Sequence, residues 1–386
     1  MKNILFSFAL FMLSLAARAQ SALTVGDAFP DWSFVSLDGQ ALTLESSRDY
    51  VLVLEFWASW CGPCRTSLAA LAELKATFGD RLVVVTLSDE DPDRQVRFAE
   101  RTGYPFHFVQ WQERWQEAFP HRIIPHAVVV NPAGRIAAIT RPELVTADVI
   151  ETLLSGEAVE LPLKAEADWD PTVPIFARDS QTIAAFAVQP ARADAPSYTR
   201  EYHQGPFAGR RITLVNLPVS GLYRHALATS IHRMELPEDE GRSYCVDFVV
   251  APEQSGQLNS LLLDSLRRQF DWRLDTVRLE RTMWVLSAAE TGLLLPEAAS
   301  PGAPTANGTS YRSAGARLAD FAAYLEEFGV AGMPVLDETG AGDRLFQLDF
   351  SFEPEDQSTF FRALEKMGVA VRKDTRTIVM YSLSPE

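Results

Sequence analysis

The sequence reads Phe56-Trp57-Ala58-Ser59-Trp60-Cys61-Gly62-Pro63-Cys64 between an apolar run at residues 50–56 and a helical pattern at residues 65–78. A strand that enters a helix through C-x-x-C places Cys61 in the first helical turn, where free backbone N–H groups and the helix dipole favour a thiolate. Gly62 and Pro63 suit this turn, because proline at a helix start gives up no hydrogen bond. We interpret the two cysteines as a dithiol/disulfide redox centre.

Composition limits the functions that the chain can have. It has 386 residues, of which 47% are hydrophobic, and its formal net charge is −16. This length allows two or three domains with ordinary cores. An acidic chain without a basic cluster argues against nucleic acids and anionic membrane surfaces as partners. Three cysteines are too few for a disulfide scaffold.

The first 19 residues have the pattern of a secretory signal peptide. Lys2 precedes an apolar run at residues 4–15, and Ala17-Arg18-Ala19 is a cleavage signal, so we expect the mature chain to begin at Gln20. The alternative is a retained anchor, although the run is shorter than the roughly 20 residues of a membrane span. Export implies an oxidising compartment. The bacterial type of signal favours the periplasm or secretion.

Residues 20–157 alternate between strand and helix patterns, which predicts an α/β domain with helices on both faces of its sheet. The expected strands are residues 50–56, 81–87, 106–110, 127–131 and 135–140, and the expected helices are residues 65–78, 92–102 and 146–155. Trp111, Trp115 and Phe119 form an aromatic stripe that we assign to core packing, with a ligand role as the alternative.

Three motifs in order link this region to a known family: the opening Val25-Gly26-Asp27-Ala28-Phe29-Pro30-Asp31, the Asp38-Gly39 turn and the W-C-G-P-C centre. Over residues 21–157 the chain resembles the TlpA-like (ResA-like) branch of exported thioredoxins. The resemblance implies a thioredoxin-like fold and a thiol-disulfide oxidoreductase that needs no cofactor. It also implies protein thiols or disulfides as substrates, and a membrane electron donor or oxidant.

The resemblance extends to the residues around the disulfide. In the family, the proline that matches Pro125 is cis and lies beside the disulfide, and the backbone of the residue before it, here Ile124, pairs with an extended substrate. An ordinary edge proline is the alternative. We expect Trp60, Gly62, Pro63, Ile124 and His126 to line the substrate site. His126 stands where relatives often have threonine, and a catalytic histidine is its alternative role.

Glu55 is an acid in an otherwise apolar strand. Thioredoxins keep an acid at this position, whereas TlpA-like relatives often have asparagine. Burial behind the disulfide would raise its pKa, so that it could accept the proton of Cys64. The alternative is a charge at the rim of the sheet. Residues 66–69 lack the proline that often kinks the helix in this family.

The expected mechanism is dithiol exchange. Cys61 attacks a partner disulfide, and Cys64 then resolves the mixed disulfide with help from Glu55. The electron supply sets the direction, and C-G-P-C resembles the reducing members. A zinc site would need two more ligands beyond the cysteine pair, and a copper chaperone would need a suitably placed histidine such as His126. We expect no metal site.

Residues 158–204 are rich in proline and read as a linker, with a possible strand or helix at residues 182–188. Residues 205–386 contain an internal repeat. Asp247-Phe248 and Asp349-Phe350 are each followed, after three intervening residues, by a Pro-Glu pair. We therefore expect two similar α+β units. Candidate helices are residues 214–227 and 317–328, and candidate closing strands are residues 283–287 and 378–383.

The C-terminal region offers no chemistry of its own. Pro334-Val335-Leu336-Asp337-Glu338-Thr339-Gly340 and Phe346–Phe350 resemble a soil-associated bacterial domain of unknown function. The repeated Asp-Phe-x-x-x-Pro-Glu motif is typical of strand ends and helix caps. We expect Cys245 to be an inert core thiol. Pairing with another chain and a role as a third redox thiol are its alternatives.

The complete set of Glu55, Cys61, Cys64 and Pro125 favours an exported thiol-disulfide oxidoreductase with an appended α+β domain. The alternative is a redox-sensing or partner-binding protein in which the C-terminal region carries the main function.

Overall fold

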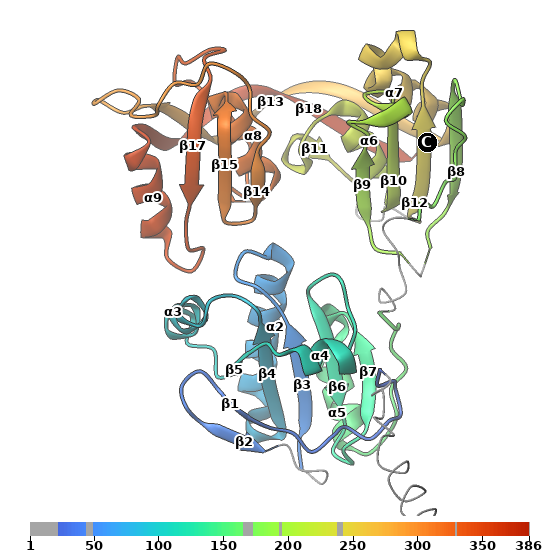
Figure 1. Ribbon diagram of the computed structural model, residues 1–386, viewed down its shortest axis with the longest axis vertical. Coiled ribbons are helices and arrows are strands. Elements are labelled where there is room, and N and C mark those ends of the chain that lie inside the picture. The colour runs from blue at the N-terminus through green and yellow to red at the C-terminus, as the bar shows by residue number, and fades with distance from the viewer. Residues whose placement is uncertain are drawn as a thin grey trace, which may run out of the picture.

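The computed structural model describes residues 22–43, 49–164, 173–192, 195–237, 242–328 and 330–385. An N-terminal α/β sheet with its helices lies on one side of the molecule, and a C-terminal region of two smaller units lies on the other (Figure 1). The expected signal peptide falls outside the described residues.

The N-terminal sheet has five strands in the order β5-β4-β3-β6-β7. Strands β3, β4 and β5 run parallel, whereas β6 and β7 are antiparallel to their neighbours. Their bounds are β3 Val51–Phe56, β4 Leu82–Ser88, β5 His107–Gln110, β6 His126–Val130 and β7 Ile136–Thr140. The short strands β1 (Ser33–Val35) and β2 (Ala41–Thr43) form the hairpin expected around Asp38-Gly39.

Helices cover both faces of this sheet, as the alternation along β3 requires. Val51 and Val53 point into a core that is shared with two helices, α2 and α5, whereas Leu52 and Leu54 point to the opposite face, where Trp115 packs. The helices are α2 Gly62–Phe78, α3 Pro92–Thr102, α4 Glu113–Ala118 and α5 Ala147–Leu154. This arrangement confirms the predicted thioredoxin-like fold and the core role of Trp115.

The two C-terminal units are built alike. The first unit has the sheet order β8-β12-β10-β9 and two helices, and the second unit has the order β14-β15-β17 and two helices. The bounds in the first unit are β8 Ala185–Pro190, β9 Tyr198–Glu201, β10 Arg211–Leu217, α6 Val219–Leu227, β12 Tyr244–Val249 and α7 Leu258–Gln269. Those in the second are β14 Thr305–Asn307, β15 Ser310–Ala316, α8 Leu318–Glu327, β17 Phe346–Ser351 and α9 Gln357–Lys366.

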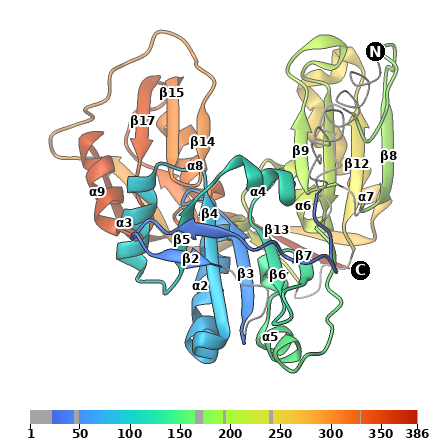
Figure 2. The same ribbon diagram turned by 60° about the horizontal axis from the view of Figure 1, so that its bottom comes forward.

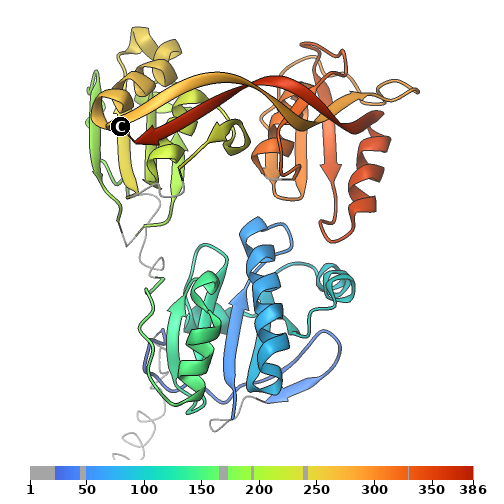
Figure 3. The ribbon, with the colours of Figure 1, turned by 180° about the vertical axis from the view of Figure 1, so that it is seen from behind.

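Two long strands join the units. β13 (Trp272–Ala288) and β18 (Val369–Pro385) have 17 residues each, pair antiparallel along their whole length and arch from one unit to the other (Figure 3). β13 begins in the first unit and pairs with β16 (Val335–Asp337) in the second, while β18 ends beside β11 (Met234–Glu235) of the first. The prediction of a short closing strand within each unit was therefore wrong, because each closing strand serves both cores.

Two further expectations differ from the structure. Residues 211–217 form β10 instead of beginning a helix, because they are rich in β-branched and apolar residues, and Pro218 then starts α6. The proline-rich stretch expected as a linker contributes β8 and β9 to the sheet of the first unit.

Candidate active site

Cys61 and Cys64 lie where β3 leads into α2. Cys61 is the N-cap residue of this helix, and its Sγ accepts a hydrogen bond from the backbone N–H of Cys64 at 3.2 Å. The two sulfurs form a disulfide with an S–S distance of 2.06 Å. When the pair is reduced, this N–H and the positive end of the helix dipole stabilise a thiolate on Cys61. Cys64 is fully buried, whereas Cys61 keeps 6% of its surface exposed.

Glu55 lies on the face of β3 that packs against α2, where its carboxyl meets Ser67. Its side chain is fully buried, and burial raises its pKa to about 8, although a hydrogen bond from Ser67 opposes the rise. One carboxyl oxygen, Oε2, has no hydrogen-bond partner among the described residues. The structure therefore places Glu55 inside the protein and not at the rim of the sheet.

Ser67 connects Glu55 to Cys64. The sequence pattern did not identify it as a site residue. Its Oγ is hydrogen-bonded to Glu55 Oε1 and lies 2.9 Å from the carbonyl oxygen of Cys64. The available signal was its position three residues after Cys64 on the same helix, which puts both residues on one face.

We expect a Ser67→Ala variant to shift the pH dependence of the exchange rate to higher pH. Loss of the hydroxyl removes the hydrogen bond that lowers the pKa of Glu55, so this pKa should rise above about 8. The check is the pH dependence of single-turnover exchange. Thr66→Ala, a change at the exposed neighbouring hydroxyl, should leave the profile in place. An unchanged profile for Ser67→Ala would show that Ser67 does not set the titration of Glu55.

The Pro125 loop lines a groove beside the helix that carries the disulfide. The Ile124-Pro125 peptide is cis. Pro63, Ile124 and Pro125 line a cavity of about 560 Å³. Two residues of the C-terminal region, Pro196 and Ser197, line the same cavity. Trp60 lies on the adjoining loop and is 39% exposed, and Gly62 is the first residue of α2. The geometry thus brings Pro63, Ile124 and Pro125 together.

His126 does not line this groove. It begins β6 in the middle of the sheet, opposite Phe56, and is only 1% exposed. Its ring stacks on His121 with a centroid distance of 4.6 Å, and neither ring nitrogen has a hydrogen-bond partner among the described residues. Burial lowers its pKa well below the ordinary value, and His121 lowers it further. The prediction of a substrate-lining or surface role was wrong, because the residue after Pro125 already belongs to a central strand.

We expect His126→Leu to reduce the loss of stability in acid. The folded state holds His126 neutral, whereas the unfolded chain protonates it below about pH 6.5, so its contribution to folding is present above that pH and is lost as the pH falls. The urea midpoints at pH 7 and pH 5 measure this loss. The exposed His203→Leu serves as the control. An equal loss in His126→Leu and the parent would contradict the assignment.

Other candidate chemistry can be placed as well. Cys245 is fully buried in β12, and its Sγ contacts Asn216 Oδ1 at 3.2 Å, as expected of a core thiol. Across the part of the chain that the structure describes, no three His, Cys, Asp or Glu side chains converge in a way that could hold a metal ion.

The N-terminal domain matches a known protein family. The model of the Redoxin family matches residues 24–154. Residues 24–154 form a Redoxin domain. It is similar to the thiol-disulfide oxidoreductase ResA of Geobacillus thermodenitrificans, with 26% identity over 139 residues, 35% of this chain and 80% of that protein. The names of such relatives and the fold agree with a TlpA/ResA-like oxidoreductase domain.

Two more relatives match the same domain. The thioredoxin-like protein YneN of Bacillus subtilis is 32% identical over 94 residues, 23% of this chain, and the match spans 55% of its length. A DsbE homologue of Paracoccus denitrificans is 32% identical over 117 residues, 29% of this chain and 63% of its own. A solved thiol:disulfide interchange protein of Chlorobium tepidum is 18% identical, covers 34% of this chain and 99% of its own, and has a TM-score of 0.30.

Proposed function

We propose that the Redoxin domain catalyses thiol–disulfide exchange with protein partners, with reduction of their disulfides as the direction. One observation carries this proposal: Cys61 caps α2 and is bonded to Cys64, and Ser67 joins the backbone of Cys64 to the buried carboxyl of Glu55. Nucleophile, resolving thiol and proton acceptor are thus held by two adjoining elements, β3 and α2.

The exchange follows from this geometry. The Cys61 thiolate attacks a partner disulfide, whose S–S bond breaks and releases one partner sulfur as a thiolate. Cys64 gives its proton to Glu55 and attacks the Sγ of Cys61, which releases the second partner sulfur. Two electrons pass to the partner, and the domain is left with the disulfide that the structure contains. Reduction by an electron donor returns it to the dithiol.

The site of action belongs to the same proposal. The signal pattern of residues 1–19 supports export to the periplasm or beyond, where protein disulfides form. A membrane electron donor would then restore the dithiol. Among the described residues, every helix is too short or too polar to cross a membrane.

A redox titration tests the proposal. The protein is equilibrated with mixtures of oxidised and reduced dithiothreitol, and free thiols are trapped and counted. We expect a reversible two-electron transition near the potential of thioredoxin, about −270 mV. A value near about −120 mV would indicate an oxidant instead. Absence of a reversible disulfide would refute the exchange activity.

A further inference from the structure

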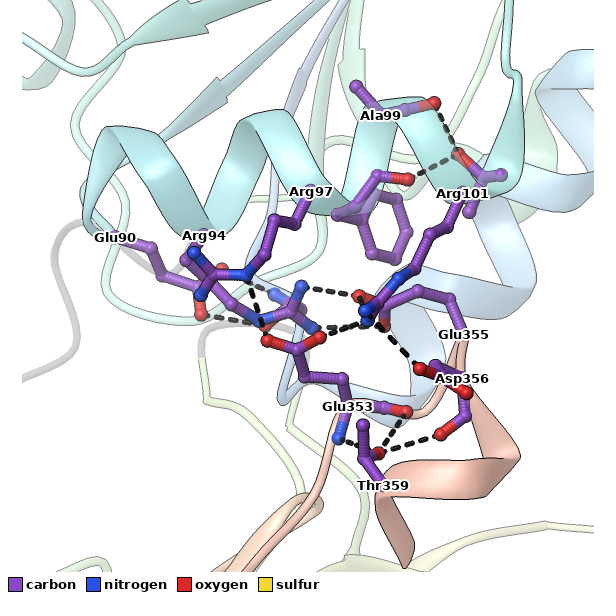
Figure 4. A network of polar contacts seen from close by, with 12 residues as sticks. Glu90, Arg94, Arg97, Ala99, Arg101, Glu353, Glu355, Asp356 and Thr359 are labelled. Atoms are coloured by element: carbon purple, nitrogen blue, oxygen red, sulfur yellow. Dashed lines mark hydrogen bonds and ion pairs between the residues drawn. The ribbon is translucent and has the colours of Figure 1, made fainter.

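The second unit contacts the Redoxin domain through charges. Three arginines of α3, namely Arg94, Arg97 and Arg101, form an arginine face, and they meet the acidic loop between β17 and α9, namely Glu353, Glu355 and Asp356 (Figure 4). Positions i, i+3 and i+7 lie on one side of a helix. Figures 1 and 2 both show α3 beside the second unit.

The innermost of these ion pairs is largely removed from solvent. Arg94 Nη2 donates to Glu355 Oε2 at 3.0 Å, and the side chains of Arg94 and Glu355 are 14% and 5% exposed. Glu353 is shared, because it accepts from Arg97 Nε at 3.0 Å and also from Arg101. Arg101 reaches Asp356 at 3.2 Å. Bidentate and shared pairs of this kind hold a fixed geometry better than single surface pairs.

The contact continues to the loop that carries Cys61. Gly308, in the turn between β14 and β15, packs so closely on Trp60 that an added Cβ would lie 2.2 Å from the Trp60 carbonyl oxygen. The φ angle of Gly308 lies outside the left-handed region, so a side chain is excluded by the close contact with Trp60 and not by the backbone conformation. Arg65 donates to the carbonyl oxygen of Ser59 at 2.9 Å and is close enough to Glu355 for their charges to interact.

Two of the three acids are specific to the unit that docks, whereas Glu355 matches Glu253 of the first unit. In the repeat, Glu353 and Asp356 of the second unit stand where the first unit has Ala251 and Gln254. Asp356, which follows the motif, caps α9 by accepting from the N–H of Ser358. Glu353 and Glu355 instead bind arginines of another domain. Capping therefore accounts for one of the three acids, and the contact with α3 accounts for all of them.

The C-terminal region thus meets the Redoxin domain at two places next to the C-G-P-C segment. The Gly308 turn packs on Trp60, the residue before Cys61, and Pro196 and Ser197 line the groove of about 560 Å³ together with Pro63 and Pro125. In Figures 1 and 3 the start of α2 is turned toward the two units. A folded domain that approaches Cys61 would collide with the C-terminal region at these places, whereas an extended chain can enter along the groove.

We propose that the docked second unit selects the partners of Cys61. While the acidic loop holds the arginine face, an extended disulfide-bearing segment reaches the sulfur from the Pro125 side, and a folded partner reaches it only after the unit has moved away. This proposal rests on the exchange activity proposed above, but access to Cys61 can be measured without that activity.

Thiol labelling of the reduced full chain measures the access. N-ethylmaleimide and a maleimide that carries a long polyethylene glycol chain share one chemistry and differ only in size. In the parent protein the large reagent should react with Cys61 far more slowly. Two variants should open this access: Gly308→Val, which cannot pack on Trp60, and the double variant Glu353→Lys with Glu355→Lys, which reverses the charges. Each should reduce the ratio of the small-reagent rate to the large-reagent rate about tenfold.

Matched variants control for damage to the fold. Gly256→Val changes a glycine that has open space around it, and Glu297→Lys reverses an exposed charge of the second unit that pairs only with Arg344 among the described residues. Both should behave as the parent does. Arg94→Glu alone should lose the protection, and adding Glu355→Arg should restore part of it, because position 355 also faces Arg101. Equal labelling by both reagents in the parent, or no change in either opened variant, would overturn the proposal.

Turnover then separates the two proposals. Reduction of a short disulfide-bonded peptide should be equal in the parent and in Gly308→Val, whereas reduction of a folded disulfide protein should rise about tenfold in the variant. If neither protein reduces the peptide, the exchange activity fails and the labelling result stands by itself. If both substrates speed up equally, the second unit controls the rate without selecting partners, and the selectivity is refuted.

Discussion

A Cys64→Ser variant is expected to lose turnover and to accumulate as a mixed disulfide between Cys61 and its partner. Cys61 caps α2, where the Cys64 N–H and the helix dipole stabilise its thiolate, so the first attack needs no second thiol. Serine at position 64 cannot attack the Cys61 sulfur, so the reaction stops at the covalent intermediate. Non-reducing electrophoresis and mass spectrometry of the adduct measure this outcome and identify the partner.

Cys61→Ser provides the matched comparison. It should form no adduct and should exchange at the background rate, because Cys64 is fully buried and cannot reach a partner disulfide. Cys245 is buried in the first unit and should not react in either variant. An adduct through Cys64 in the Cys61→Ser protein would reverse the assigned order of attack.

Glu55→Gln is expected to slow the resolving step by about 100-fold, the lower range for loss of a positioned proton acceptor. The pKa of Glu55 is raised to about 8, so in the parent the rate of this step should increase with pH through that value as the carboxylate forms. The amide side chain of the variant cannot accept the proton, and that rise should disappear. Stopped-flow release of partner thiols from a preformed mixed disulfide would measure both effects. A rise that persists in the variant would assign it to another group.

Glu55 should also affect the stability of the fold, and this effect decreases with pH whereas the rate of the resolving step increases. The folded-state pKa of Glu55 lies above its unfolded value of 4.5, so the folded state binds the extra proton between about pH 4.5 and pH 8. Its contribution is therefore fully present below pH 4.5 and is lost progressively as the pH rises toward about 8. Urea unfolding of Glu55→Gln at several pH values should show a much flatter dependence. A curve parallel to that of the parent would contradict burial of a protonated Glu55.

Much of the Redoxin domain followed from local sequence. The predicted helix at residues 92–102 coincides with α3, which proline and Asp91 start and Gly103 ends. The buried strands and the C-x-x-C turn could be predicted equally well. Short apolar runs are typical of buried strands, and a proline in this position is typical of a helix start. The C-terminal region was harder: its repeat was visible, but a 17-residue strand shared by two cores has no local signal.

Some residues of the site could be predicted from the sequence, and others were found only in the folded structure. The sequence by itself determined Cys61, Cys64 and the acid at position 55, because a dithiol at a helix start and a lone acid in an apolar strand stand out within a few residues. Only the tertiary structure decided that Ser67 joins Glu55 to Cys64, that His126 is buried against His121, and that Glu353 and Glu355 bind α3. Such contacts join segments distant along the chain, and their energies depend on burial and geometry that exist only after the chain has folded.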